Sequence, residues 1–376
     1  MLGPVRSILR SPLRSIAIMT DGILVAKEEM ARYMMDCMKA AGADASHASQ
    51  LADVLIAGDY RGHYSHGLNR LDMYVRDLQK EVVRPSGEPV LLKEKAATAW
   101  VDGGNLLGPV VGNFCTQLAI KKAKEAGVGW FVAKNSNHYG IAGYYSMKCL
   151  EQGLLGMSFT NTSPISYPTR SAAGALGTNP LTLAAPGQDG DAFVLDMATT
   201  TVAVGKVELA GRKGQQIPDG WGVDSSGIQT HDPAKVVPDG GLYPLGGAEM
   251  TGGYKGYGLA ALVEVFCGIL GGATYGPNVR RWMKTDRPAD LGQAFIAIDP
   301  EAFAPGFSGR MQDLMQLLRG LPRVDESAPV LVAGDPERAH MEECDKAGGI
   351  PYHPNQIAHA KELAEELKVA PLKTLN

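Results

Sequence analysis

Apolar residues recur every three or four positions along the first part of the chain, between residues 23 and 80. This spacing predicts amphipathic helices, because positions three and four apart share one helical face. Two apolar stripes have this spacing: Leu51, Val54, Leu55 and Gly58, and then Leu68, Leu71, Val75 and Leu78. We therefore expect the chain to begin with a helical segment.

The middle of the chain, from residue 97 to about residue 245, has a different pattern. Short runs rich in β-branched and aromatic residues alternate there with Gly, Pro and Asn turns and with helical stretches, which indicates a mixed α/β body. Further on, the pattern predicts a strand at 293–298, a helix at 309–318 and an amphipathic helix at 355–368 capped by Asn355. Strands in the α/β body are expected at 128–133, 154–160 and 193–196.

Both ends of the chain are thus predicted to be helical. We expect residues 21–95 and 330–376 to form one discontinuous helical domain around an α/β body at 96–329 that binds substrate and cofactor. The most apolar run, 257–270, is 14 residues long and contains Glu264. It is shorter than the roughly 20 residues that cross a bilayer, so we interpret it as a buried helix.

The first 20 residues form an extension with a composition of its own. Arg6, Arg10 and Arg14 repeat every four positions, serines lie between them, and no acid is present. This composition resembles a mitochondrial transit peptide, and the alternative is an unstructured extension upstream of a start at Met19. The sequence is thus compatible with a cytoplasmic or a mitochondrial protein.

Composition narrows the class of partner. The net charge of −4 provides no general attraction to nucleic acid or to an anionic membrane, so we expect a small-molecule partner. The five cysteines are scattered and odd in number, and no two are spaced as C-x-x-C. A disulfide framework and a cysteine zinc site are therefore not indicated, and a reducing, intracellular setting fits.

The segment 59–70 carries the first candidate chemistry. His66 and Arg70 are four residues apart and would share a helical face. An arginine can hold a carboxylate with two hydrogen bonds while a histidine exchanges a proton on the neighbouring oxygen, as the chemistry of 2-oxo acids requires. Alternatives are a surface histidine beside a solvated arginine, or a metal site built on His63 and His66, for which no acidic or cysteine ligand lies nearby.

Three further segments are candidates for a binding site. His138 follows a predicted strand and precedes a helix expected to begin near Gly140, whose N-terminus would favour the neutral ring; the alternative is a turn histidine that holds the loop. Asp196 ends a strand and is followed by threonines, an arrangement that a simple helix cap also explains. Gly246 and Gly247 precede Lys255 in a glycine-rich segment. Such a segment can turn backbone amides toward an anion beside the lysine, and the alternative is a turn in which the glycines only allow close packing. A G-x-G-x-x-G motif after a strand is absent, so the usual dinucleotide fold is not assumed.

Taken in order, these segments resemble the type 2 malate/L-lactate dehydrogenase family. The family also includes L-sulfolactate and ureidoglycolate dehydrogenases and Δ1-piperideine-2-carboxylate reductases. The resemblance covers about residues 21–370. Its motifs are Ser65-His-Gly with Arg70, Asn135-Ser-Asn-His-Tyr-Gly, Gly177-Thr-Asn-Pro, Asp196-Met-Ala-Thr and Gly253-Tyr-Lys-Gly-Tyr-Gly-Leu. Five motifs in one order are far more specific than any one of them.

The resemblance implies an α/β, non-Rossmann nicotinamide-binding fold with a largely antiparallel sheet, a homodimer, and NAD or NADP as cofactor. It implies His66 as the proton donor and acceptor with Ser65 beside it, Arg70 as the carboxylate clamp, and His138 in the substrate pocket. The cofactor contacts it implies are Asn161, Thr162, Asp196, Met197, Ala198, Gly246, Gly247 and Lys255. One departure is Gly334-Asp-Pro-Glu337, where the family has Pro-Gly-Glu; the glycine-rich segment that begins at Gly246 is also longer than expected.

The sequence therefore predicts an oxidoreductase that moves a hydride between NAD(P)H and a small 2-oxo acid. Two alternatives remain: reduction of a cyclic imine acid, which shares the hydride and carboxylate chemistry, and a non-catalytic nicotinamide-binding protein. No metal, nucleic acid or membrane is expected to take part.

Overall fold

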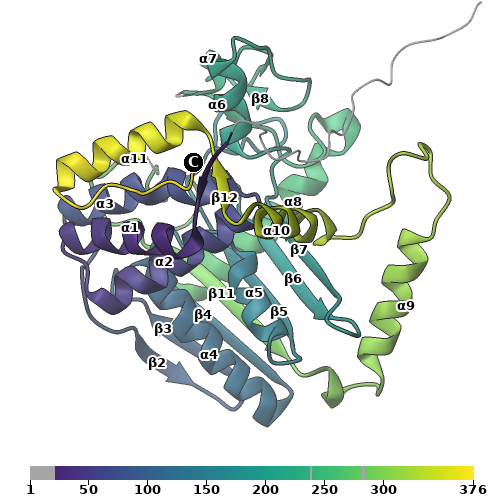
Figure 1. The fold of residues 1–376 in the computed structure, drawn as a ribbon. Helices are drawn as coiled ribbons and strands as arrows, with labels where there is room; N and C mark the ends of the chain where they lie inside the picture. The colour runs from purple at the N-terminus through teal and green to yellow at the C-terminus, as the bar shows by residue number, and fades with distance from the viewer. Residues whose placement is uncertain (1–21, 238, 282–283) are drawn as a thin grey trace, which may run out of the picture.

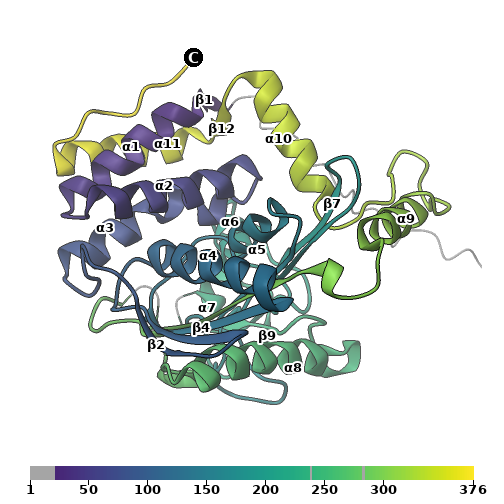
Figure 2. The ribbon, with the colours of Figure 1, turned by 90° about the horizontal axis from the view of Figure 1, so that it is seen from below.

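The computed structural model describes residues 22–237, 239–281 and 284–376. A twisted sheet of seven strands forms the centre, and helices cover both of its faces (Figure 1). Viewed from below, the helices of the two chain ends form an outer layer above α4 and α5, and α8 lies on the opposite side of the sheet (Figure 2). The expected mixed α/β architecture is confirmed.

The central sheet has the strand order β2-β3-β4-β11-β5-β6-β7. Within the described residues β3 and β4 run parallel, and the other neighbouring strands run antiparallel, which agrees with the largely antiparallel sheet that the family resemblance implies. β11 is buried along almost its whole length, which explains its nearly continuous apolar sequence. The strands are β2 (Val90–Glu94), β3 (Thr98–Asp102), β4 (Val128–Ser136), β5 (Leu155–Thr160), β6 (Leu181–Pro186), β7 (Ala192–Met197) and β11 (Leu291–Ile298).

Two of the helices show how local sequence sets their ends. α2 begins where the Asp44 side chain accepts a hydrogen bond from the backbone N–H of Ser46 at 2.8 Å, and α4 ends at Gly127 in the left-handed conformation. The helices next to the sheet are α4 (Gly108–Ala126), α5 (Gly143–Leu150) and α8 (Gly253–Glu264). The outer layer consists of α1 (Lys27–Ala40), α2 (Ala45–Tyr60), α3 (Leu71–Gln79) and α11 (Pro354–Leu367).

Smaller elements complete the fold. α6 (Val204–Arg212) and α7 (Pro233–Val236) pack beside a small sheet of β8 (Gly222–Val223), β9 (Gln229–Thr230) and β10 (Gly241–Leu242). α9 (Phe307–Arg319) stands away from the body, and α10 (Asp335–Ala347) leads back toward it (Figures 1 and 2). No helix in the described part of the chain is long and apolar enough to cross a membrane.

The two ends of the chain lie together. β1 (Ile23–Val25) pairs with β12 (Ile350–Tyr352), and the Tyr33 hydroxyl on α1 donates to the carbonyl of Ala360 on α11 at 2.6 Å. One continuous apolar core joins these helices to the sheet, with Met34, Val101 and Phe295 all fully buried in it. The division into a helical domain (21–95 with 330–376) and a body (96–329) remains a prediction.

Several expectations need correction. The helix at 257–270 begins at Gly253, continues into a π-helical turn at Val265–Ile269, and exposes one apolar face, so it is not fully buried. α5 begins at Gly143 rather than near Gly140. The cap of α11 is His353, whose side chain accepts from the backbone N–H of Asn355, and not Asn355 itself. The extension at 1–20 lies outside the described residues.

Candidate active site

A pocket of about 270 Å³ lies between the segment before α3, the loop after β4 and the end of β7. His66, Arg70 and His138 all line it, together with Ser65 and Asp196. The fold thus brings together the three side chains that the sequence singled out for acid-base and carboxylate chemistry. These come from segments about 70 residues apart, so the fold creates the arrangement and no short motif contains it.

A buried carboxylate holds the segment that carries His66. Asp59, in the last turn of α2, is fully buried and accepts from the backbone N–H of Leu68 at 2.8 Å and from the Tyr352 hydroxyl at 2.9 Å. Burial raises the pKa of Asp59 to about 7, and the two hydrogen bonds partly offset that rise. Gly67 packs directly on this carboxyl group: a Cβ there would be 1.9 Å from Oδ1 of Asp59. The chain can therefore turn at this point only with glycine.

His66 lies in the short 3-10 turn Tyr64–His66 with its ring between two polar neighbours. Its Nδ1 is hydrogen-bonded to the Ser65 hydroxyl at 2.8 Å, and its ring stacks on His138 with centroids 5.9 Å apart. Burial, and then the nearby His138 and Arg70, lower the pKa of His66 well below 6.5. The imidazole is therefore neutral near pH 7 and can accept a proton.

His138 is held by two donors on one ring nitrogen. The backbone N–H of Gly140 donates to Nδ1 at 3.3 Å, and the Tyr74 hydroxyl on α3 lies 2.5 Å from the same atom. Since Nδ1 accepts, the proton of the neutral ring is assigned to Nε2. Burial and then Arg70 lower the pKa of His138 to about 3. The expected helix-terminus effect is not the cause, because α5 begins five residues later at Gly143.

Arg70 precedes α3 and extends into the pocket. Its Nε donates to the carbonyl of Ser65 at 2.7 Å, which ties the guanidinium to the turn of His66. Burial lowers the pKa of Arg70 from its ordinary value, and Glu208 on α6 partly opposes that shift. The group remains a cation, so it provides a fixed positive charge beside two neutral imidazoles.

The residues expected at the cofactor divide into three places. Thr162, Asp196, Met197 and Ala198 line the pocket. Asn161 is fully buried beneath it, where its amide donates to Glu264 and to the carbonyl of Thr274 and its oxygen accepts from Gly292. Lys255 lies in the first turn of α8, and Gly246 and Gly247 lie in the segment that leads to it. None of the three lines the pocket. Asp196 accepts from the backbone N–H of Gly143 at 2.8 Å, so it caps α5 rather than a helix of its own segment.

The comparisons decide the family. Residues 25–361 match the model of the malate/L-lactate dehydrogenase family. The chain belongs to this family. A malate dehydrogenase of Pyrococcus abyssi is 36% identical over 354 residues, which is 93% of this chain and 97% of the relative. An L-sulfolactate dehydrogenase of Methanocaldococcus jannaschii is 36% identical over 348 residues, 92% of this chain and 97% of the relative. The structure of malate dehydrogenase from Pyrococcus horikoshii superimposes with a TM-score of 0.86 at 34% identity, covering 94% of this chain and 98% of that one.

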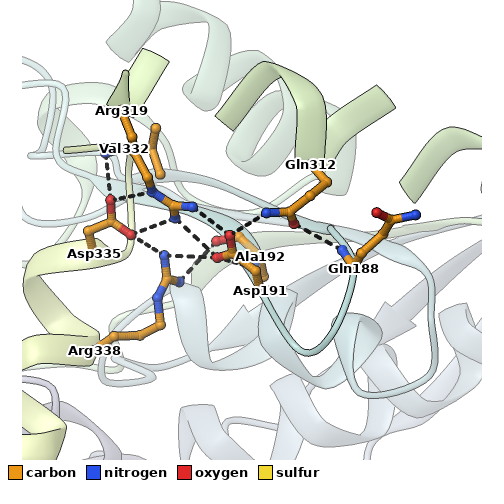
Figure 3. Close-up of polar contacts among 8 residues, drawn as sticks. All are labelled: Gln188, Asp191, Ala192, Gln312, Arg319, Val332, Asp335 and Arg338. Atoms are coloured by element: carbon orange, nitrogen blue, oxygen red, sulfur yellow. Dashed lines mark hydrogen bonds and ion pairs between the residues drawn. The ribbon is translucent and has the colours of Figure 1, made fainter. Parts of the chain in front are cut away.

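Membership of the malate/L-lactate dehydrogenase family makes the departure at Gly334–Glu337 informative. Asp335 begins α10 and binds Arg319 of α9 at 2.7 Å, and Arg319 also binds Asp191 in the β6–β7 turn at 2.5 Å (Figure 3). Arg338 contacts both carboxylates and donates to the carbonyl of Ala192 (Figure 3). This network fixes α10 beside β7, the strand that carries Asp196.

α10 also reaches the site directly. Glu337 lies 3.6 Å from Nε2 of His63, which lines the pocket beside Ser65. Among the described residues, no group of three or more His, Cys, Asp or Glu is arranged to hold a metal ion.

Sequence reasoning missed three residues of the site. Tyr74, four residues after Arg70 on α3, lies against His138, and this helical spacing was a usable signal. Asp77 and Arg280 form a buried ion pair in the pocket wall. Arg280 is 203 residues away from Asp77, and nothing in the local sequence connects the two.

Proposed function

We propose that the chain is a nicotinamide-dependent oxidoreductase that interconverts a small 2-hydroxy acid and its 2-oxo acid. One observation carries the proposal: two neutral, stacked imidazoles and one partly buried guanidinium share a single pocket. That set can hold a carboxylate and move a proton on the adjacent oxygen. The family match supports an enzyme acting on hydroxy acids.

Each residue has a role in this proposal. Arg70 holds the C1 carboxylate through its guanidinium, which places the C2 oxygen near the two imidazoles. Neutral His66 accepts the hydroxyl proton in the oxidative direction and returns it in the reductive one. His138 donates from Nε2 to the same oxygen and orients it, since Tyr74 and Gly140 occupy its Nδ1. Ser65 orients His66.

The pocket also fits a nicotinamide group. Its lining includes small residues that leave room for a flat ring, among them Ala198, Ala203 and Gly205, and hydroxyl groups that can bind an amide, from Thr160, Thr162 and Thr178. We propose that Asp196, Met197 and Ala198 hold this end of NAD or NADP without a Rossmann motif. When bound, the nicotinamide ring would accept the hydride from C2 of the 2-hydroxy acid or supply it to C2 of the 2-oxo acid.

Three other cofactor candidates, Gly246, Gly247 and Lys255, lie in the first turn of α8 or in the segment that leads to it. Lys255 is on the exposed first turn of that helix, and Gly247 packs directly against Gly253. A helix N-terminus with an adjacent lysine favours anions, so we propose that this region meets the phosphates.

We further propose that two copies associate through the exposed face of α8 and its π-helical turn. Tyr254, Leu262, Val265 and Ile269 recur there at helical spacing, and each is more than 40% exposed. Apolar surface of this kind is typical of homodimer interfaces. Replacing Val265 and Ile269 by Asp should give a monomer in analytical ultracentrifugation, and Leu317→Asp on α9 is the matched control. A wild-type monomer would contradict the dimer.

A substrate panel tests the proposed function. The purified chain is mixed with NADH or NADPH and with pyruvate, oxaloacetate or Δ1-piperideine-2-carboxylate, and the loss of reduced nicotinamide is followed. We expect turnover with a 2-oxo acid. Turnover with the imine acid alone would favour the imine reductase, and cofactor binding without turnover of any acid would favour a non-catalytic protein.

A further inference from the structure

The pocket wall contains an ion pair that does not belong to the group of His66, His138 and Arg70. Arg280 meets Asp77 through two contacts, Nη2 to Oδ2 at 2.9 Å and Nη1 to Oδ1 at 3.2 Å. The two side chains are only 5% and 6% exposed. Both residues line the pocket, so the pair forms part of the surface that a ligand meets.

The position of the pair along α3 places it beyond the carboxylate clamp. Arg70, Met73 and Asp77 share one face of this region, and all three line the pocket. Seven residues at ~1.5 Å each separate the two ends of that face by about 10 Å. With a C1 carboxylate on Arg70, the substrate side chain extends along apolar surface from Met73, Ala289 and Leu291. The polar groups at the far end are then Asp77 and Arg280.

A cation that is already paired with a carboxylate differs chemically from a free one, although Nε of Arg280 itself has no hydrogen-bond partner. Arg280 is already committed to Asp77 and to the carbonyl of Arg287, 3.2 Å from its Nη1. A second carboxylate on the substrate would face the charge of Asp77 as well as that of Arg280 and would remain a buried charge without a counter-ion. An amide can accept from the guanidinium and donate to the carboxylate without adding charge.

From this geometry we infer that Asp77 and Arg280 select substrates whose side chain is uncharged and ends in a hydrogen-bonding group such as an amide. The inference rests on the proposed function and adds the side-chain class. Family membership leaves that class open, since the relatives are named for different acids. The pair would disfavour a substrate that ends in a second carboxylate as well as bind one that ends in an amide.

Three acids of nearly equal shape test the inference on the wild-type enzyme. They are oxaloacetate, its C4 monoamide 2-oxosuccinamate, and 4-methyl-2-oxopentanoate, which end in a carboxylate, an amide and two methyl groups. We expect kcat/KM to be highest for the amide, by about tenfold or more over each of the others. An equal or higher value for oxaloacetate or for the methyl compound overturns the inference. If pyruvate is reduced and none of the three is, the inference alone fails; if no 2-oxo acid is reduced, the proposed function itself fails.

A charge change in the wall provides a second test. Asp77→Asn keeps an acceptor for Arg280 but leaves the wall cationic, so kcat/KM for oxaloacetate relative to the amide should rise about tenfold or more. Asp72→Asn, the same substitution on the outer side of α3 beside Arg76, should leave that ratio unchanged. An unchanged ratio in a folded Asp77→Asn protein overturns the inference. If that variant does not fold, the wild-type ranking decides alone.

Discussion

The ring of His66 stacks on that of His138 with centroids 5.9 Å apart and planes inclined by 19°. Two protonated imidazoles at this distance would repel each other, and burial lowers the pKa of both rings, so both are neutral. Their surroundings nevertheless differ: Ser65 is the hydroxyl partner of His66, whereas Tyr74 and Gly140 hold Nδ1 of His138. The two histidines are therefore suited to different tasks.

The first prediction concerns this division of labour. His66→Asn should lower kcat by about a hundred- to ten-thousand-fold, because the group that moves the proton is lost, while cofactor affinity stays unchanged. His138→Asn should leave a measurable rate. Single-turnover hydride transfer compares the two variants, and the reverse ranking would show that His138 moves the proton.

The second prediction is a pH dependence. Because the pKa of His66 is lowered below 6.5, its proton leaves at a lower pH than that of an ordinary histidine. The neutral base is then present from pH 6.5 upward, so kcat/KM for oxidation of the 2-hydroxy acid should fall only at pH values below 6.5. NMR titration of the imidazole protons checks this independently. A His66 resonance that titrates at pH 6.5 or above would be inconsistent with the proposed environment.

The third prediction concerns the carboxylate clamp. Arg70→Met should raise KM for the 2-oxo acid by an amount equivalent to about 2 to 5 kcal/mol, since a partly buried charge pair is lost. Cofactor binding, followed by fluorescence titration, should be retained. Arg76→Met is the matched control on α3, because Arg76 pairs with Asp72 and Glu366 at the surface. An unchanged KM in the Arg70→Met variant would show that Arg70 does not hold the substrate carboxylate.

The fourth prediction concerns the turn that carries the site. Gly67→Ala would place a Cβ against the buried carboxyl of Asp59, so it should cost about 1 to 3 kcal/mol in the free energy of unfolding and disturb His66. A Cβ at Gly309, on α9, meets only the Gln188 side chain, at an ordinary contact distance of 3.5 Å, and Gly309→Ala should be neutral or stabilising by up to about 1 kcal/mol. Urea unfolding measures both. Equal stability of the two variants would argue against the packing of Gly67 on Asp59.

Much of the fold follows from local pattern. β11 and the helices of both ends appear where periodicity placed them, since burial on one or both faces leaves a regular trace in the sequence. The exposed face of α8 was not foreseen, because an apolar run looks the same whether it meets the core or open surface. The start of α5 was misplaced because Gly140, with φ of 79°, turns the loop before the helix begins.

Part of the site could be predicted from the sequence as well. His66, Arg70 and His138 carried recognisable motifs, so their convergence in one pocket could be expected. The lowered pKa of His138 was anticipated for the wrong reason, because burial depends on what the fold packs around the ring. The pairing of Asp77 with Arg280 joins α3 to a loop 203 residues later, and only the folded chain brings them together.

Isotope transfer tests the central claim most directly. Reduced nicotinamide cofactor labelled with deuterium at C4 is incubated with the chain and a 2-oxo acid in ordinary water, and the product is analysed by mass spectrometry. If the pocket of His66, His138 and Arg70 carries out hydride transfer, the 2-hydroxy acid will carry the deuterium at C2. A reduced product without deuterium at C2 from either face of the labelled ring, or no reduced product with any acid of the panel, would contradict the account.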